Sequence, residues 1–237
     1  MAINLEDHLD ADHLAVLEML PGDLLDLSDL DEARIRWAGF MAQGPVPEID
    51  DSIEITDHHT PAGDGHQVLV RVYRRKDRRD DRGGLYSIHG GGMVLGDVSM
   101  NDARCAAIAL NLDVVVASVD YRLAPEHPYP APLEDCYCGL VWFFDQAGAF
   151  GVDTARIAVG GGSAGGGLAA GLALLARDRG QVSPCFQLLT FPMIDDRNQT
   201  PSSHMVDDTR LWNRAANIAG WSAYLDGRNG AEDVPVY

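Results

Sequence analysis

The sequence predicts an α/β fold in which a mostly parallel β-sheet carries helices on both faces. Two observations lead to this prediction. Short β-branched runs alternate with longer Ala- and Leu-rich runs between residues 85 and 191, a pattern typical of parallel strands joined by helices. The chain also has 237 residues with 46% hydrophobic content, which is enough to bury the core of one such domain.

Helices and an antiparallel lead-in are expected before the parallel part of the sheet. The first fifty residues carry an apolar helical face around Trp37, which must cover another apolar surface. After the Pro-Val-Pro break at 45–47, strand-like runs at 53–55 and 68–72 follow each other closely. Their alternation of apolar and polar side chains predicts a pair of antiparallel strands.

The core of the fold is predicted from strand-like and helix-like runs that follow one another. In order along the chain they are strand 85–88, helix 103–110, strand 114–119, helix 133–147, strand 156–159, helix 164–177 and strand 186–191. A polar loop at 195–208 and a helix at 211–224 come next, with no further strand-like run. Such an order winds a parallel sheet with helices on both of its faces.

Charge and composition exclude several classes of function. The chain has 36 acidic and 18 basic residues, a formal net charge of −18, which would repel nucleic acids and anionic membrane surfaces. No apolar run has the length of a membrane span and the acidic start does not resemble a secretory signal, so we expect a cytoplasmic protein. The four cysteines lack the C-x-x-C spacing of metal sites, and we predict no metal and no cofactor.

A glycine-rich stretch at 160–167 marks the junction between a predicted strand and a predicted helix. It contains G-x-S-x-G, with Gly161 and Gly165 on either side of Ser163. A nucleophile elbow needs small residues at these positions, because the serine occupies a sharp and strained strand-to-helix turn. The motif therefore predicts Ser163 as an exposed nucleophile.

The same stretch also fits the dinucleotide-binding pattern G-x-G-x-x-G, at Gly160, Gly162 and Gly165. In dinucleotide-binding folds, an acidic residue near the end of the next strand holds a ribose hydroxyl. The next predicted strand ends at Leu189-Thr190-Phe191 without such an acid. We therefore favour the nucleophile elbow.

A second glycine-rich turn, His89-Gly90-Gly91-Gly92, directly follows the predicted strand 85–88. Ester hydrolysis develops negative charge on the carbonyl oxygen, and fixed backbone N–H groups stabilise this charge. The N–H groups of Gly90, Gly91 and Ala164 are the candidate donors. We expect His89 and Gly92 to support the turn, with His89 acting through hydrogen bonds rather than as the general base.

These motifs resemble those of the hormone-sensitive lipase family of α/β-hydrolases, which pairs an H-G-G-G turn with a G-D-S-A-G-G elbow. A third stretch, beginning Asp120-Tyr121-Arg122-Leu123-Ala124-Pro125-Glu126, resembles the family's D-Y-R-L-A-P-E block. The resemblance implies an α/β-hydrolase fold and a serine esterase for short-chain acyl esters. It also implies an N-terminal helical cap over the pocket, which we assign to residues 1–48, with the hydrolase core at 49–237.

The sequence departs from the family pattern in two ways. Gly162 stands where the family usually has Asp, which removes a polar side chain and keeps the small residues of the turn. The family also takes its acid and then its histidine from loops after later strands, and those strands are missing here. We expect the acid and base beyond Tyr237; a compact triad of Ser163, Asp195 and His204 satisfies only the order along the chain.

Two functions remain open on the sequence alone. The first is a serine carboxylesterase that forms an acyl-enzyme on Ser163 and takes a small-molecule ester as its substrate. The second is a catalytically incomplete hydrolase fold that serves as a ligand-binding or interaction module. Assembly into a homo-oligomer is compatible with both.

Overall fold

The computed structural model describes residues 7–44, 48–77 and 79–234, and the chain divides into two compact units. We call Val46–Ile194 the core unit. The second, which we call the helical unit, combines Met1–Pro45 with Asp195–Val234. The core unit contains every strand of the sheet, and the two units are described separately below.

The core unit is built on a six-stranded sheet with strand order β1-β2-β4-β3-β5-β6. The strands are β1 (Ile53–Pro61), β2 (Gln67–Arg75), β3 (Arg82–Ile88), β4 (Val115–Asp120), β5 (Val152–Gly162) and β6 (Phe186–Thr190). β1 pairs with β2 and β2 pairs with β4 in antiparallel fashion, and the other pairs are parallel. The predicted fold, a mostly parallel sheet after an antiparallel lead-in, is confirmed.

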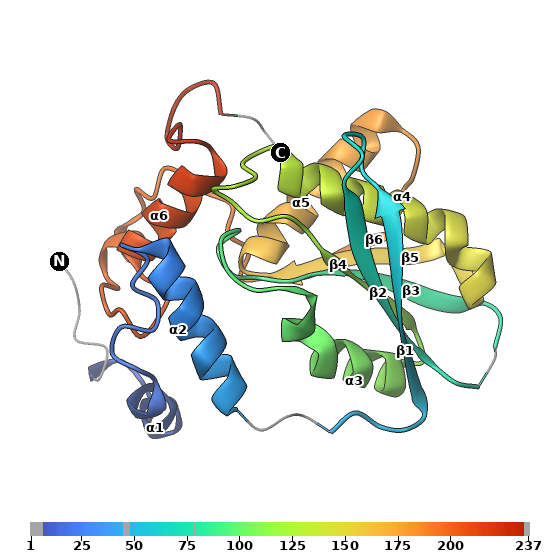
Figure 1. Cartoon of the computed structure of the whole chain (residues 1–237), viewed down its shortest axis with the longest axis horizontal. Helices are drawn as coiled ribbons and strands as arrows, with labels where there is room; N and C mark the ends of the chain where they lie inside the picture. Colours follow the sequence, from blue (N-terminus) through green and yellow to red (C-terminus); the bar gives the residue numbers. More distant parts are fainter. Residues whose placement is uncertain (1–6, 45–47, 78, 235–237) are drawn as a thin grey trace. The chain divides into compact units, whose positions relative to one another are not determined.

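Three helices cover this sheet: α3 (Asp102–Leu112), α4 (Ala131–Phe150) and α5 (Ala164–Arg179). Figure 1 shows α3 on one face of the sheet, with α4 and α5 on the other. Strand side chains alternate between the faces, so Leu85 packs with the α3 cluster while the neighbouring Tyr86 stacks on Phe143 of α4. Gly151 and Gly180 end α4 and α5 in the left-handed conformation, as is common after helices.

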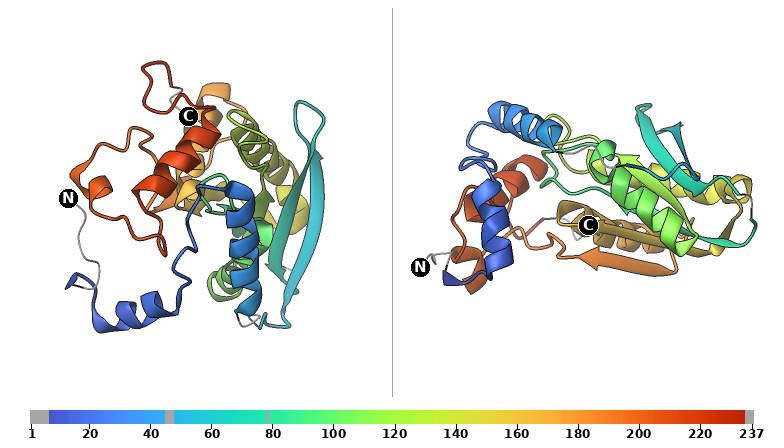
Figure 2. Two further views of the ribbon diagram at one scale, coloured as in Figure 1. Left: turned by 60° about the vertical axis from the view of Figure 1, so that its left-hand side comes forward. Right: turned by 90° about the horizontal axis from the view of Figure 1, so that it is seen from below.

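The inner strands of the sheet owe their position to their sequences. β4 reads Val-Val-Ala-Ser-Val-Asp and is buried at every residue except the last, as expected for a strand covered on both faces. The hairpin of β1 and β2 lies at one edge of the sheet and β6 lies at the other (Figure 2). Phe186 of β6 is 61% exposed, so within the described residues this edge of the sheet is open.

The helical unit contains α1 (Ala11–Met19), α2 (Leu30–Gln43) and α6 (Arg214–Tyr224). Its two stretches of chain are joined by hydrogen bonds: the Leu25 N–H donates to the Thr209 carbonyl at 2.8 Å, and the Thr209 hydroxyl donates to the Gly22 carbonyl. These bonds join residues far apart in the sequence within the helical unit. The division into a cap at 1–48 and a core at 49–237 stays a prediction. Among the helices described, none is both long and apolar enough to cross a membrane.

Candidate active site

The two glycine-rich turns lie at the carboxyl ends of adjacent parallel strands. His89 follows β3 and Ser163 follows β5, and these strands pair in parallel with Ile88 opposite Gly161. The chain leaves β3 toward β4 on one side and leaves β5 toward β6 on the other. In open α/β sheets, such a divergence of connections creates the crevice where ligands bind.

Ser163 has the strained backbone expected of a nucleophile elbow. Its dihedral angles are φ 55° and ψ −123°, a positive φ that residues other than glycine rarely adopt. Its N–H donates to the Thr190 carbonyl at 3.0 Å, and its own carbonyl accepts from Met193 at 2.9 Å and Gly167 at 3.1 Å. These bonds hold the strained turn in place. The side chain makes no capping bond to α5, so its hydroxyl is not engaged by the helix.

Both glycines of the G-x-S-x-G motif lie too close to other backbone atoms to carry a side chain. A Cβ on Gly165 would stand 2.2 Å from the Ile88 carbonyl oxygen and 2.5 Å from that of His89. A Cβ on Gly161 would stand 2.4 Å from the carbonyl of Gly165. The elbow therefore packs directly on the end of β3, and only glycine permits this approach.

The His89–Gly92 turn brings Gly90 beside Ser163. A Cβ on Gly90 would lie 3.0 Å from the Gly162 carbonyl oxygen and 3.4 Å from Ser163 Cβ. The next residue, Gly91, has φ 109°, and its carbonyl accepts from Val94 at 3.0 Å and Leu95 at 2.8 Å. The turn is thus closed by its own hydrogen bonds at the edge of the elbow.

The predicted oxyanion donors have unused N–H groups. Ala164 is the first residue of α5, where the backbone N–H has no partner within the helix and the helix dipole is positive. Across the described part of the chain, no acceptor is found for the N–H groups of Gly90, Gly91 or Ala164. Unpaired N–H groups around a nucleophile can bind a developing oxyanion.

His89 is buried under the turn. Its side chain is fully buried, its Nδ1 donates to the Gly90 carbonyl at 2.7 Å, and its ring stacks on Tyr121 with centroids 4.2 Å apart. Burial holds the pKa of His89 below its usual range, because desolvation disfavours the charged ring. A neutral, enclosed histidine bonded to the turn is placed to support it.

The compact triad of Ser163, Asp195 and His204 is not supported within the helical unit. The Asp195 carboxylate accepts from the side chain of Arg197 at 2.8 Å, and this bond lowers the pKa of Asp195. His204 is exposed at the end of a short 3-10 helix. A triad requires a carboxylate bonded to its histidine, and Asp195 is bonded to an arginine instead.

The acid and base predicted beyond Tyr237 lie outside the described residues. In the core unit, no described side chain hydrogen-bonds to the Ser163 hydroxyl. His127 and Glu126 follow the D-Y-R-L-A-P block and are exposed, and His58 packs on Trp142 with ring centroids 5.1 Å apart. The core unit thus contains the predicted nucleophile and the predicted oxyanion donors, and none of its described side chains is bonded to the Ser163 hydroxyl.

Four residues near the site were not assigned a role from the sequence. The Tyr121 hydroxyl donates to the His89 carbonyl at 3.0 Å. The fully buried Asp135 accepts from the Arg122 guanidinium at 2.7 Å. Arg104 Nη1 lies 3.9 Å from the position that a Gly162 Cβ would take. The D-Y-R-L block drew attention to Tyr121 and Arg122, but their hydrogen-bond partners lie too far away in the sequence to be found without the structure.

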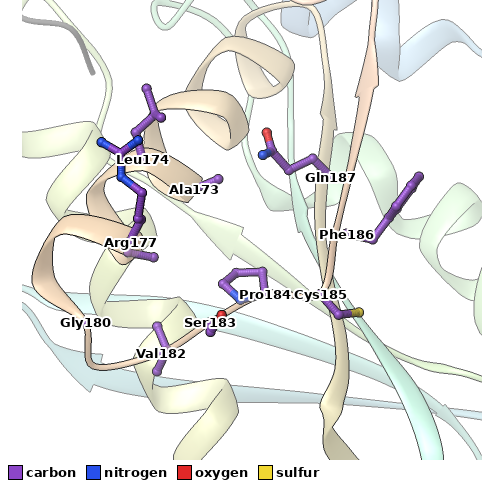
Figure 3. Close-up of a pocket in the computed structure, with 11 residues that line it drawn as sticks. Ala173, Leu174, Arg177, Gly180, Val182, Ser183, Pro184, Cys185, Phe186 and Gln187 are labelled. Carbon is purple, nitrogen blue, oxygen red and sulfur yellow. The ribbon is translucent and has the colours of Figure 1, made fainter.

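A pocket of about 720 Å³ lies at the other end of β6. Figure 3 shows it between the end of α5, the following loop and the start of β6, with Leu174, Pro184 and Phe186 among its lining residues. The start of β6 pairs with the middle of β5, whereas Thr190 at its far end pairs with Gly162 beside the nucleophile. None of the candidate site residues lines this pocket, so we do not assign it to the chemistry of Ser163.

Comparisons with known proteins identify the family of this chain. Residues 85–236 match a family model described as an alpha/beta hydrolase fold. The esterase LipI of Mycobacterium tuberculosis (strain ATCC 25618 / H37Rv) is 50% identical, over 94% of this chain and 68% of its own length. The carboxylic ester hydrolase LipN of the same strain is 37% identical, over 79% of this chain and 44% of its own.

Solved structures of esterases are also similar to this chain. A bacterial heroin esterase superposes with a TM-score of 0.90 at 38% identity, covering 99% of this chain and 74% of that one. A thermostable esterase from Pseudomonas putida ECU1011 has a TM-score of 0.81 at 29% identity, covering 91% of this chain and 68% of that one. The chain spans 44% to 68% of the length of the first three curated relatives. With its elbow and H-G-G-G turn, the chain belongs to the hormone-sensitive lipase family of α/β-hydrolases.

Proposed function

We propose that this protein is a serine carboxylesterase that hydrolyses short-chain acyl esters through an acyl-enzyme on Ser163. One observation carries the proposal: Ser163 stands in a strained elbow with Gly90 of the H-G-G-G turn beside it, 3.4 Å from Ser163 Cβ to the Cβ position of Gly90. The names of the relatives, an esterase and a carboxylic ester hydrolase among them, add support.

The proposed reaction proceeds in two steps on one serine. Ser163 Oγ attacks the acyl carbon, its proton passes to a base, and negative charge develops on the carbonyl oxygen. The N–H groups of Gly90, Gly91 and Ala164 bind that oxygen; each such donor is worth about 3–4 kcal/mol in known oxyanion holes. The alcohol leaves with a proton, and water then attacks the acyl-enzyme to release the carboxylic acid and restore the serine.

Turnover of a chromogenic ester tests this proposal. Purified protein should release p-nitrophenol from p-nitrophenyl butyrate, and Ser163→Ala should abolish the release. Ser183→Ala is the matched control, since Ser183 is exposed in the loop after α5 and should leave the rate unchanged. Equal rates for wild type and Ser163→Ala would reject Ser163 as the nucleophile.

A catalytically incomplete hydrolase fold, used as a ligand-binding or interaction module, is the second candidate. The observation that favours it is the lack, in the described core unit, of a side chain bonded to the Ser163 hydroxyl. An absence of turnover with short, medium and aromatic esters, combined with saturable binding of an ester analogue, would select this candidate. Turnover lost on Ser163→Ala would reject it.

We also propose that residues 1–48 act as a cap that sets which acyl chains enter. The support is the family resemblance and the apolar face around Trp37. Substituting Trp37→Ala should change the ratio of rates for p-nitrophenyl acetate and hexanoate without altering the reactivity of Ser163 toward a small phosphonate. A cytoplasmic location and a homo-oligomeric state stay predictions, which cell fractionation and light scattering test.

A further inference from the structure

Tyr121 lies under the oxyanion turn, at the first position after β4. It is 3% exposed. Its hydroxyl donates to the His89 carbonyl at 3.0 Å and, over a longer distance of 3.4 Å, to the Gly90 carbonyl. His89 Nδ1 donates to the same Gly90 carbonyl at 2.7 Å. The two rings are nearly parallel, with 13° between their planes, so both donors come from one stacked pair.

These bonds hold two consecutive peptide units of the turn. A trans peptide is planar, with its C=O and N–H pointing in opposite directions. The His89 carbonyl shares its peptide with the Gly90 N–H, and the Gly90 carbonyl shares its peptide with the Gly91 N–H. When each carbonyl is held toward the buried Tyr121–His89 pair, the N–H on the other side of that peptide is directed away from the pair.

Resting on the proposed esterase function, we propose that Tyr121 and His89 form a clamp that aims the N–H groups of Gly90 and Gly91 at the substrate's oxyanion. Tyr121 is a positioning residue of the reaction, since it acts through the peptide that it bonds. The clamp is needed because glycines restrict their backbone least, and Gly91 at φ 109° could flip the peptide before it. Oxyanion stabilisation depends on donors fixed before the charge develops.

The burial of His89 supports its role in the clamp. His89 is fully buried and its Nε2 has no hydrogen-bond partner among the described residues. Its ring therefore bonds through Nδ1 to the Gly90 carbonyl of the turn. Desolvation also lowers the pKa of His89, which keeps the ring neutral near neutral pH. A neutral ring bonded to a carbonyl through Nδ1 carries its proton there, in the orientation that the clamp requires.

The substitution Tyr121→Phe tests the clamp, because it removes the hydroxyl and keeps the stacked ring. We expect kcat for p-nitrophenyl butyrate to fall roughly 10- to 100-fold, with KM within about twofold. The affinity for a boronic acid that mimics the tetrahedral intermediate should fall by the same factor as kcat/KM. Tyr137→Phe is the matched control. The Tyr137 hydroxyl donates to the Gln181 side chain, away from the turn, so kcat/KM and the boronic-acid affinity should both stay at the wild-type level.

Variants of His89 test the second half of the clamp. In His89→Asn the side-chain amide nitrogen can stand near the place of Nδ1 and donate to the Gly90 carbonyl, whereas His89→Leu has no donor. His89→Asn should therefore keep at least tenfold more activity than His89→Leu when both fold, as judged by thermal unfolding. Equal activity of the two folded variants would overturn the role assigned to His89.

A readout without turnover separates the clamp from the esterase proposal. In spectra of protein labelled with ¹⁵N-glycine, Tyr121→Phe should shift or broaden the Gly90 and Gly91 signals and increase their amide exchange, while Gly139 in α4 stays unchanged. If wild type hydrolyses no ester, the proposed function fails and these signals alone decide the clamp. Unchanged Gly90 and Gly91 signals, or a kcat within twofold of wild type in an active enzyme, would overturn it.

Discussion

The packing of the elbow on β3 predicts effects of very different size for two substitutions three residues apart. In Gly165→Ala the new Cβ would stand 2.2 Å from the Ile88 carbonyl oxygen and 2.5 Å from that of His89, and neither backbone group can rotate away. In Gly162→Ala the nearest atom is Phe191 Cε2 at 3.8 Å, an ordinary contact. We therefore expect a severe effect at Gly165 and a mild one at Gly162.

The expected magnitudes follow from these distances. Forcing an extra carbon into a filled backbone contact costs about 3 kcal/mol or more, which lowers Tm by roughly 6–12 °C in a chain of this size. Gly162→Ala should change the free energy of unfolding by less than about 1 kcal/mol. Part of this change is stabilising, because alanine lowers the conformational entropy of the unfolded chain. Activity should follow the same order, because the carbonyls displaced by Gly165→Ala belong to the peptides of the oxyanion turn.

Urea and thermal unfolding of both variants, followed by tryptophan fluorescence, measure the difference. The m-value must match that of wild type, since a change in m would mean that the chain no longer unfolds in the same way. A Gly165→Ala protein as stable and as active as Gly162→Ala would refute the close approach of the elbow to β3.

Three further predictions follow from the same contacts. Gly162→Asp should be tolerated and pair with Arg104, whose Nη1 lies 3.9 Å from the new Cβ, which should raise the free energy of unfolding by up to about 1 kcal/mol. A double-mutant cycle with Arg104→Gln should measure this coupling, and additive effects of the two substitutions would contradict it. Arg122→Ala should cost about 3–5 kcal/mol, because it leaves the buried Asp135 carboxylate without its guanidinium; urea unfolding with a loss under about 1 kcal/mol would contradict this. The pKa of His89 is lowered from 6.5 in the folded state, so the unfolded chain binds more protons and the free energy of unfolding should fall as pH drops through 6.5. In urea titrations between pH 5 and 7, His89→Asn should weaken this pH dependence, and an unchanged dependence would contradict the prediction.

Much of the core unit was predictable because its information is local. Strands and α-helices from residue 82 to residue 190 follow from alternating runs of β-branched and helix-forming residues, and each observed strand and α-helix overlaps its prediction. Ser163 and the His89–Gly92 turn were found for the same reason: glycines required by close backbone approach leave a signature within a few residues. Position along the chain then placed both turns at the carboxyl ends of strands.

The remaining features depend on contacts between distant parts of the sequence. The association of Thr209 with Gly22 and Leu25 leaves no local pattern in the sequence, because the bonded residues lie far apart along the chain. Arg82 is 5% exposed and bonds to Asp77 and Asp113, a burial that the charged sequence around it does not reveal. Tyr121 is a further case, since its partner lies 32 residues away and only the fold brings them together.

The central claim is that Ser163 is the nucleophile of this protein, and covalent labelling tests it most directly. A fluorophosphonate loses fluoride when a serine hydroxyl attacks its phosphorus, and peptide mapping by mass spectrometry locates the adduct. We predict one phosphonylated residue, Ser163, and no adduct in Ser163→Ala under the same conditions. An adduct on another serine, or equal labelling of wild type and Ser163→Ala, would contradict the claim.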